Sequence, residues 1–379
     1  MSVEIIDKNK VWLSSPHMGG EEQSFVAEAF EQNWIAPLGP NVDAFEYDLE
    51  LCLGSGSKVA LLSSGTAAIH LGLKLLGVDR GDDVICQSFT FSASANPIQY
   101  LGANPIFVDS EKDTWNICPK LLEKCIVERI AFGKKPKAII AVHLYGMPYK
   151  IDRIKLISQK YNIPVLEDSA EALGSMFNGN NCGTFGDISI LSFNGNKIIT
   201  TSGGGALVTK NADIKSKAVY LATQARDNAP HYQHSDIGYN YRMSNVLAGI
   251  GRGQMKVLKD RVEGRRKNYS IYTEELSAIE NIDFLPEPKG YFSNRWLTCI
   301  LTKSFEVREE IRKTLDEENI ESRPLWKPMH MQPVFANELH YVNGVSEDLF
   351  NRGLCLPSGT NIPEEALLRT SELIKKIVK

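Results

Sequence analysis

From Lys58 onward, short apolar segments alternate with amphipathic stretches, and this alternation constrains the fold more than any other feature. The strands we expect are 59–62, 84–87, 105–108, 138–142, 164–167, 188–193 and 206–209. The helices we expect are 66–76, 92–101, 119–130 and 152–161. Strands that are apolar throughout are buried on both faces, and a strand–helix–strand order favours a mostly parallel sheet sandwiched by helices. The sequence therefore predicts an α/β fold with functional residues at the carboxyl ends of the strands.

The segments that flank this alternation predict an arm and a smaller second domain. Residues 1–57 form an N-terminal arm with two helical stretches joined by a loop rich in proline and glycine. A long amphipathic helix, capped by Ser244 or Asn245, follows the alternating region. We therefore expect the arm and a large domain within residues 1–250, and a small C-terminal α+β domain within residues 251–379.

Composition and charge argue against several classes of protein. The 379 residues carry a formal net charge of -4, without the basic excess of a nucleic-acid-binding protein. No apolar run approaches the roughly 20 residues of a membrane helix. Residues 1–8 lack the pattern of a signal peptide, so we expect a cytoplasmic protein. The seven cysteines form no CxxC pair and the seven histidines show no metal-ligand spacing, so we expect free thiols and no metal.

Lys197 lies on a tight connection that leaves the predicted core. The buried strand 188–193 comes just before it, and three glycines at 203–205 lead directly into the next strand. Lysine is usually a solvated surface cation. A lysine on a loop anchored in the core, however, can have its pKa lowered by burial or by nearby cations, and its amine then becomes nucleophilic. Lys197 is therefore a candidate for forming a Schiff base.

Two other strand ends carry residues that would complete such a site. After strand 59–62, Ser64 and Gly65 lead into a helix whose free N–H groups and dipole would attract an anion. A plain strand–helix turn with Ser64 as N-cap is the alternative. A second buried strand runs into Glu167 and Asp168, and charges placed there need a partner. The aspartate could hold a protonated pyridine nitrogen, and a charge pair at a helix N-terminus is the alternative.

Together these stretches resemble the DegT/DnrJ/EryC1/StrS family of pyridoxal phosphate (PLP)-dependent sugar aminotransferases over essentially the whole chain. The segments that carry the resemblance are 64–68, 88–91, 167–174, 183–187, 192–197, 203–205 and 238–242. The resemblance implies a fold-type I aminotransferase with pyridoxal 5'-phosphate as its cofactor. A second set of segments is similar to the branch that aminates a UDP-linked 4-keto-6-deoxy-N-acetylhexosamine in bacillosamine synthesis: 15–20, 35–39, 194–205, 223–226, 294–297 and 323–327.

The resemblance also implies a role for individual residues. Lys197 would be the catalytic residue, which bonds to the cofactor and later moves a proton. The cofactor would be held by Gly65, Thr66, Ala67, Phe91, Asp168, Glu171, Ser192 and Asn240. Of these, Asp168 would hold the pyridine nitrogen, Phe91 would stack on the ring, and Asn240 would reach the phosphate of the neighbouring subunit in a homodimer with shared active sites. Glu171 stands where many relatives have Gln or His, and a carboxylate there would be repelled by the cofactor's phenolate unless it is protonated or turned towards the substrate.

The residues expected to bind the nucleotide diphosphate are His17, Arg226, Arg295, Arg323, Trp326 and His330. Guanidinium groups pair with phosphate and aromatic faces stack on a base. Ordinary surface or core packing is the alternative for each of them.

The implied reaction is a ping-pong transamination from L-glutamate to the C4 ketone of the UDP-sugar. The product is a UDP-4-amino-4,6-dideoxy-N-acetylhexosamine for surface glycans. A dTDP-linked 4-ketone and a UDP-linked 3-ketone remain open as substrates. Dehydratases of the family carry histidine at the position of Lys197, which argues against that branch. A regulatory or scaffold protein would have a damaged cofactor set, whereas Lys197 and Asp168 are both present. We expect neither nucleic-acid nor membrane partners.

Overall fold

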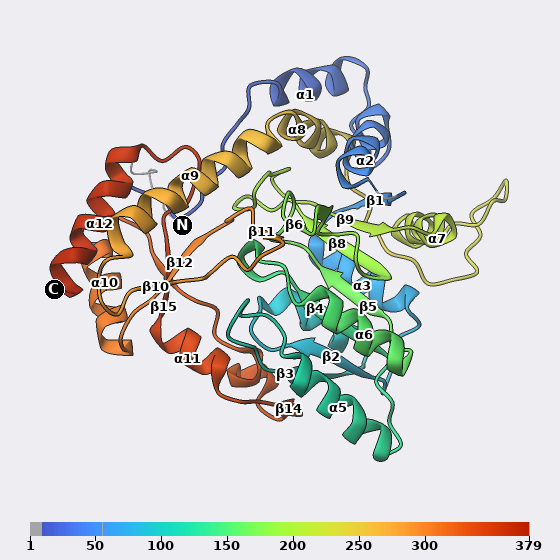
Figure 1. The fold of residues 1–379 in the computed structure, drawn as a ribbon. Helices are drawn as coiled ribbons and strands as arrows, with labels where there is room; N and C mark the ends of the chain where they lie inside the picture. Colours follow the sequence, from blue (N-terminus) through green and yellow to red (C-terminus); the bar gives the residue numbers. More distant parts are fainter. Residues whose placement is uncertain (1–9, 55, 379) are drawn as a thin grey trace.

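The computed structural model describes residues 10–54 and 56–378, and the expected absence of a signal peptide concerns residues 1–8, which lie outside them. Within the described residues, the central sheet has eight strands in the order β1-β9-β8-β5-β4-β2-β3-β14 (Figure 1). The strands are β1 (Lys58–Leu62), β9 (Gly205–Thr209), β8 (Ile188–Ser192), β5 (Val165–Asp168), β4 (Ala138–Val142), β2 (Asp83–Gln87), β3 (Asn104–Val108) and β14 (His340–Tyr341).

The strand directions confirm the prediction of a mostly parallel sheet. From β8 through β5, β4, β2 and β3 to β14, every neighbouring pair is parallel. Only β9 runs the other way, antiparallel to both β8 and β1. Strands β2, β4, β5 and β9 are buried at every position, as their continuous apolar sequences predict. This arrangement agrees with the α/β fold that the sequence predicts.

Helices cover both faces of the sheet, because the side chains of each strand alternate between two apolar clusters. One face packs on α3 (Gly65–Leu75), α4 (Asn96–Tyr100) and α7 (Ala212–Ala222). The other face packs on α5 (Pro119–Ala131) and α6 (Ile151–Tyr161), and beside them on α2 (Pro40–Leu53) and α8 (Asn245–Lys256). In β1, for example, Ala60 and Leu62 point to the first cluster and Val59 and Leu61 to the second. Helix α1 (Glu22–Glu31) lies against α8 at the top of Figure 1.

The C-terminal region builds a second, smaller sheet. Its strands are β10 (Asp283–Phe284), β12 (Thr298–Leu301), β15 (Gly353–Leu356) and β13 (Arg323–Pro324), in that order. Its helices are α9 (Leu258–Leu276), α10 (Phe305–Glu317), α11 (Val345–Arg352) and α12 (Glu364–Val378). The single long helix expected after Ser244 is wrong in one respect, because Val257, with φ -112° and ψ 7°, separates α8 from α9.

The C-terminal region is joined to the large domain at two places, one of which is a separate sheet of three strands. Strand β11 (Tyr291–Phe292) pairs with β6 (Met176–Phe177), which also pairs with β7 (Asn180–Asn181). Strand β14, close to the C-terminal end, forms the edge of the large sheet beside β3. Strand β12 begins only at Thr298, because Arg295 adopts a positive φ of 52° and the chain turns there. The domain boundary at residue 250 falls inside α8 and stays a prediction.

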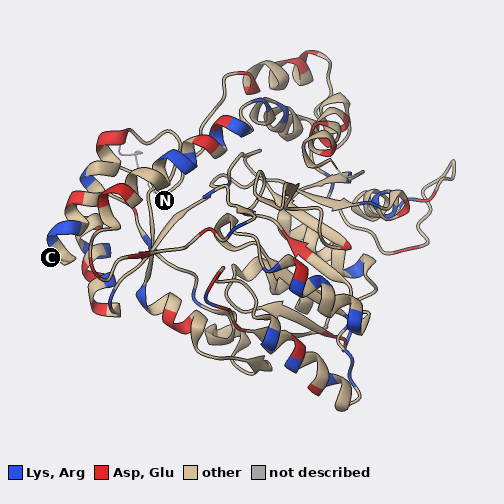
Figure 2. Cartoon of the chain, in the orientation of Figure 1, with Lys and Arg blue, Asp and Glu red and all other residues tan. Residues whose placement is uncertain are grey.

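Charged residues lie mainly on the outer helices, and most of the central sheet contains none (Figure 2). Within residues 10–54 and 56–378, no helix has both the length and the apolar character needed to span a bilayer. In the same residues, no three His, Cys, Asp or Glu side chains are grouped so that they could hold a metal ion.

Candidate active site

A cavity of about 300 Å³ lies at the carboxyl ends of the parallel strands, where functional residues were predicted. The structure brings the following predicted site residues to its wall: Gly65, Thr66, Phe91, Asp168, Glu171, Ser192, Lys197 and Trp326. They come from separate loops, and β5 and β8, which deliver Asp168 and Ser192, are parallel neighbours. The sequence stretches that were considered separately therefore meet at one place.

Lys197 is held on a loop that is anchored by two other parts of the chain. The Asn196 carbonyl accepts hydrogen bonds from the Ser14 hydroxyl and from the Trp296 indole N–H, both at 2.7 Å. The Lys197 Nζ lies 3.5 Å from Glu171 Oε1 and 4.2 Å from the centroid of the Trp296 ring. The Lys197 side chain is only 12% exposed. Its amine therefore sits in the cavity, with a carboxylate on one side and an aromatic face on the other.

Asp168 ends strand β5 with its carboxylate held in place. Its Oδ2 accepts the Ser94 hydroxyl at 2.6 Å, and its Oδ1 accepts the Ala170 N–H at 3.1 Å. Ser94 hydrogen-bonds in turn with the Thr90 hydroxyl. Sequence reasoning missed Ser94. A signal existed, since it lies three residues after Phe91 and the two are brought to one side by the short 3-10 turn Ser92–Ser94.

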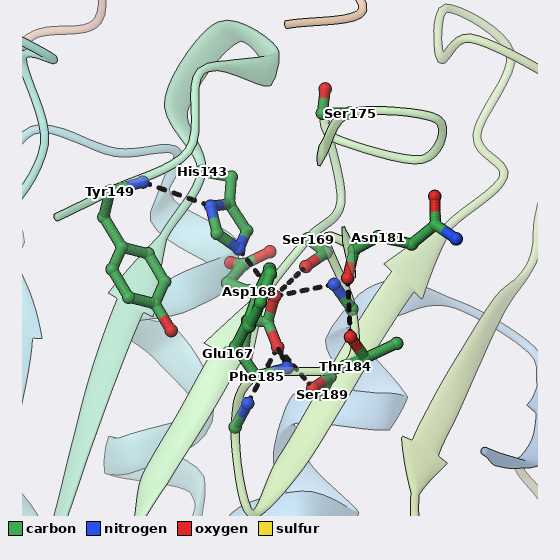
Figure 3. A network of polar contacts seen from close by, with 12 residues as sticks. His143, Tyr149, Glu167, Asp168, Ser169, Ser175, Asn181, Thr184, Phe185 and Ser189 are labelled. Atoms are coloured by element: carbon green, nitrogen blue, oxygen red, sulfur yellow. Dashed lines mark hydrogen bonds and ion pairs between the residues drawn. The ribbon is translucent and has the colours of Figure 1, made fainter. Parts of the chain in front are cut away.

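Glu167, next to Asp168, points to the other side of β5 into a closed polar network (Figure 3). Its Oε1 accepts His143 Nε2 at 2.6 Å, the Gly183 N–H and the Ser169 hydroxyl. Its Oε2 accepts the N–H groups of Phe185 and Gly186 and the Ser189 hydroxyl. Burial alone would raise the pKa of Glu167, but His143 and the other donors outweigh it and hold that pKa at about 2. Of the two carboxylates at this strand end, Glu167 therefore binds backbone N–H groups away from the cavity, and Asp168 lines the cavity.

The N-terminus of α3 forms one end of the cavity. Ser64 caps the helix, because its hydroxyl accepts the Ala67 N–H at 3.0 Å. The N-cap alternative for Ser64 is thus correct, and the helix end faces the cavity as well. Ala67 does not line the cavity, since its N–H is used by the cap. A Cβ at Gly205 would collide with the Ser64 backbone, so this close approach of loop and helix requires glycine.

An aromatic wall closes the opposite end of the cavity. The rings of Phe91 and Trp326 lie 5.3 Å apart, and Tyr145 stacks between Trp326 and Trp296 at 6.2 and 6.4 Å. The buried indole N–H of Trp326 has no hydrogen-bond partner within the described residues. Trp296 was not among the predicted site residues, because only the packing of the C-terminal region on the large sheet brings it to Lys197.

The remaining predicted substrate residues do not line the cavity within this chain. His17 contacts the Thr360 hydroxyl, Arg226 lies over the Tyr232 ring, Arg295 donates to the Leu285 carbonyl, Arg323 pairs with Glu321, and His330 contacts the Ser88 hydroxyl at 2.6 Å. Burial lowers the pKa of Arg295, which is 5% exposed. Asn240 is exposed on the surface, next to Thr223 in an isolated bridge. The substrate and partner roles of these residues stay predictions.

Known proteins of one family are similar to this chain over nearly its whole length. The model of the DegT/DnrJ/EryC1/StrS aminotransferase family matches residues 16–375. The chain is 51% identical to EpsN of Bacillus subtilis (strain 168), a protein assigned to the pyridoxal phosphate-dependent aminotransferases, with 96% of this chain and 95% of that one covered. It is 37% identical to the GDP-perosamine synthase of Escherichia coli O157:H7, with 95% and 96% covered. A crystal structure of a DegT DnrJ EryC1 StrS aminotransferase from Brucella abortus superposes with a TM-score of 0.89 at 28% identity, covering 94% of this chain and 95% of that chain.

Proposed function

Because the chain belongs to the DegT/DnrJ/EryC1/StrS aminotransferase family, and is therefore a PLP-dependent transaminase of nucleotide-linked keto-sugars, we propose a specific substrate for it. The enzyme moves the amino group of L-glutamate to the C4 ketone of a UDP-linked 4-keto-6-deoxy-N-acetylhexosamine. It acts in the cytoplasm, and its product is a UDP-4-amino-4,6-dideoxy-N-acetylhexosamine for a surface glycan, as in bacillosamine synthesis.

The cavity suits pyridoxal phosphate at both ends. We assign the phosphate to the N-terminus of α3, where Gly65 and Thr66 begin the helix opposite Ser192, because N–H groups and the helix dipole favour an anion there. Asp168 is assigned to the ring nitrogen, and Phe91 to one face of the ring. When bound, the cofactor supplies an electron sink for the carbon that carries the transferred amine.

Lys197 supplies the reactive amine of the protein itself. The observation that carries the proposal is that Lys197 and Asp168 follow neighbouring parallel strands and face one cavity. In this role Lys197 would hold the cofactor through its amine between turnovers, and the same amine would take up and release a proton during them. The Trp296 ring against the Lys197 amine keeps water from that side.

We also propose that two chains share their sites. Arg226 and Asn240 are exposed on adjoining segments, and Tyr232 and Ile237 between them are each 80% exposed, which is unusual for large apolar side chains. A second copy of the chain would cover this surface and receive Asn240. Mixing a Lys197→Ala chain with an Asn240→Ala chain should then restore activity to about a quarter of that of the parent, because one site in four has neither substitution. If neither variant is rescued by the other, the sites are not shared.

The substrate is tested by turnover of purified enzyme with L-glutamate and a panel of keto-sugars. We expect 2-oxoglutarate and a 4-amino-sugar, identified by mass spectrometry, with kcat/KM at least tenfold higher for the UDP-linked 4-ketone than for dTDP- or GDP-linked 4-ketones or a UDP-linked 3-ketone. The GDP-linked sugar is included because the relative from Escherichia coli is named GDP-perosamine synthase. Preference for another carrier would refute the UDP assignment. Lys197→Ala serves as the inactive control.

A further inference from the structure

Glu171 has one carboxylate oxygen fixed and the other aimed at the reactive amine. Its Oε2 accepts the backbone N–H of Tyr145 at 2.7 Å. Its Oε1 lies 3.5 Å from Lys197 Nζ. The side chain is 5% exposed, and turning it away from Lys197 would break a buried hydrogen bond. The carboxylate is therefore held in place against the amine.

The backbone that holds Glu171 is strained and is kept so by its surroundings. Tyr145 has a φ of 53°, in the left-handed region that non-glycine residues avoid. Its hydroxyl accepts the backbone N–H of Trp326 at 2.9 Å, and its ring stacks on Trp296. On the other side, Asn294 Nδ2 donates to the Glu171 carbonyl at 2.9 Å. Strain that is maintained in this way is typical of functional sites. Here the strained conformation directs the backbone N–H of Tyr145 at Glu171.

The charges around Glu171 permit it to change its protonation state. The titratable groups that face it are Lys197, Asp168, Tyr145 and Cys299. Burial raises the pKa of Glu171, the charge of Lys197 and the Tyr145 N–H act against this, and Asp168 adds to it. A carboxylate whose pKa is raised in this way accepts a proton more readily than an exposed one.

We propose that Glu171 is the proton partner of Lys197. The ammonium of Lys197 must lose a proton before its amine can attack, and Glu171 Oε1 accepts that proton, so that an ammonium and a carboxylate become an amine and a carboxylic acid. The proton returns by the same contact when the amine is released. Since Glu171 acts through Lys197, it is a positioning residue, and the inference rests on Lys197 being the reactive lysine of the proposed function. It replaces the expected contact of Glu171 with the cofactor's oxygen.

The test measures the reactivity of Lys197 against pH in the full chain freed of cofactor. Acetic anhydride is the probe, and the acetylated Lys197 peptide is quantified by mass spectrometry from pH 6 to pH 11. Glu171→Gln keeps an oxygen for the Tyr145 N–H but cannot ionise. We expect it to lower the pH midpoint of acetylation by more than about 0.2 units, because an opposite charge beside an ammonium favours its protonated form.

Glu171→Ala separates charge from structure. If Glu171 acts as the proton partner, the Gln and Ala variants shift the midpoint alike. If it only supports the Tyr145 backbone, Ala changes the profile and Gln leaves it within about 0.2 units of the parent, which overturns the proposal. No shift in either variant overturns it as well. Because neither substrate nor cofactor is present, failure of the proposed sugar specificity does not affect this result.

Discussion

Replacing Glu167 with Gln should destabilise the fold without touching the cavity. Glu167 is fully buried, and each of its oxygens accepts three hydrogen bonds, including three backbone N–H groups in total. The NH₂ group of Gln would face backbone N–H groups, which are donors themselves and cannot rotate away from it. The pKa of Glu167 falls from 4.5 to about 2 on folding, and about 2.5 pKa units at 1.36 kcal/mol each give a stabilisation of about 3 kcal/mol at neutral pH.

The sign of this contribution fixes its pH dependence. A carboxylate whose pKa is lower in the folded state stabilises the fold above its unfolded pKa, and this stabilisation is lost as the pH falls through the folded pKa. The parent and Glu167→Gln should therefore differ in free energy of unfolding by about 3 kcal/mol at pH 6. This difference should shrink by about 2 kcal/mol by pH 3, because the unfolded parent then takes up a proton at Glu167 while the folded parent still keeps the carboxylate. Urea unfolding followed by tryptophan fluorescence at each pH measures it.

Glu171→Gln is the matched control. Glu171 is also a buried glutamate, four residues after Glu167 in the turn that follows β5, but its pKa is raised on folding. Removing its charge should therefore cause no loss of stability at pH 6. The reasoning is refuted if Glu167→Gln costs less than about 1 kcal/mol, or if its cost stays constant between pH 6 and pH 3.

Other predictions follow from single contacts. Gly146→Ala should lower the free energy of unfolding by about 2–4 kcal/mol, because φ is 83° and the new Cβ would collide with Asn294, whereas Gly133→Ala, with φ 82° and open space, should cost about 1 kcal/mol. Thermal unfolding of both variants measures the two losses of stability. Equal losses would contradict the predicted collision of the new Cβ with Asn294. Ser94→Ala removes the hydroxyl that donates to Asp168, so the cofactor should dissociate roughly tenfold faster, as measured by absorbance during dialysis. Unchanged retention would show that Asp168 needs no such support.

The sheet could be predicted from the sequence because its strands are continuous apolar runs, and the observed ends differ from the predicted ones by about one residue. Lys197 and Asp168 could be placed for the same reason, since each follows such a run. By contrast, two-residue strands such as β14 carry no periodic signal. Nor does the sequence around Val257 hold a glycine or proline next to the break between α8 and α9.

The parts of the site that could not be predicted all depend on distant packing. Trp296 reaches Lys197 only because the C-terminal region folds against the loop of Asn196. The orientation of Glu171 depends on the unusual backbone of Tyr145, which follows an ordinary-looking strand end. Within this chain Arg295 does not line the cavity, because its guanidinium group donates to the buried Leu285 carbonyl, whereas the exposed Arg226 and Arg323 contact Tyr232 and Glu321.

The placement of β14 has a consequence for synthesis on the ribosome. Strand β3 is made early, but its outer edge is paired by His340 and Tyr341, which emerge long after it. Throughout that interval the nascent sheet presents an open hydrogen-bonding edge, which is a template for pairing with other chains. A chaperone that binds extended segments would find its target there. Premature termination before residue 340 should yield aggregates rather than a soluble large domain.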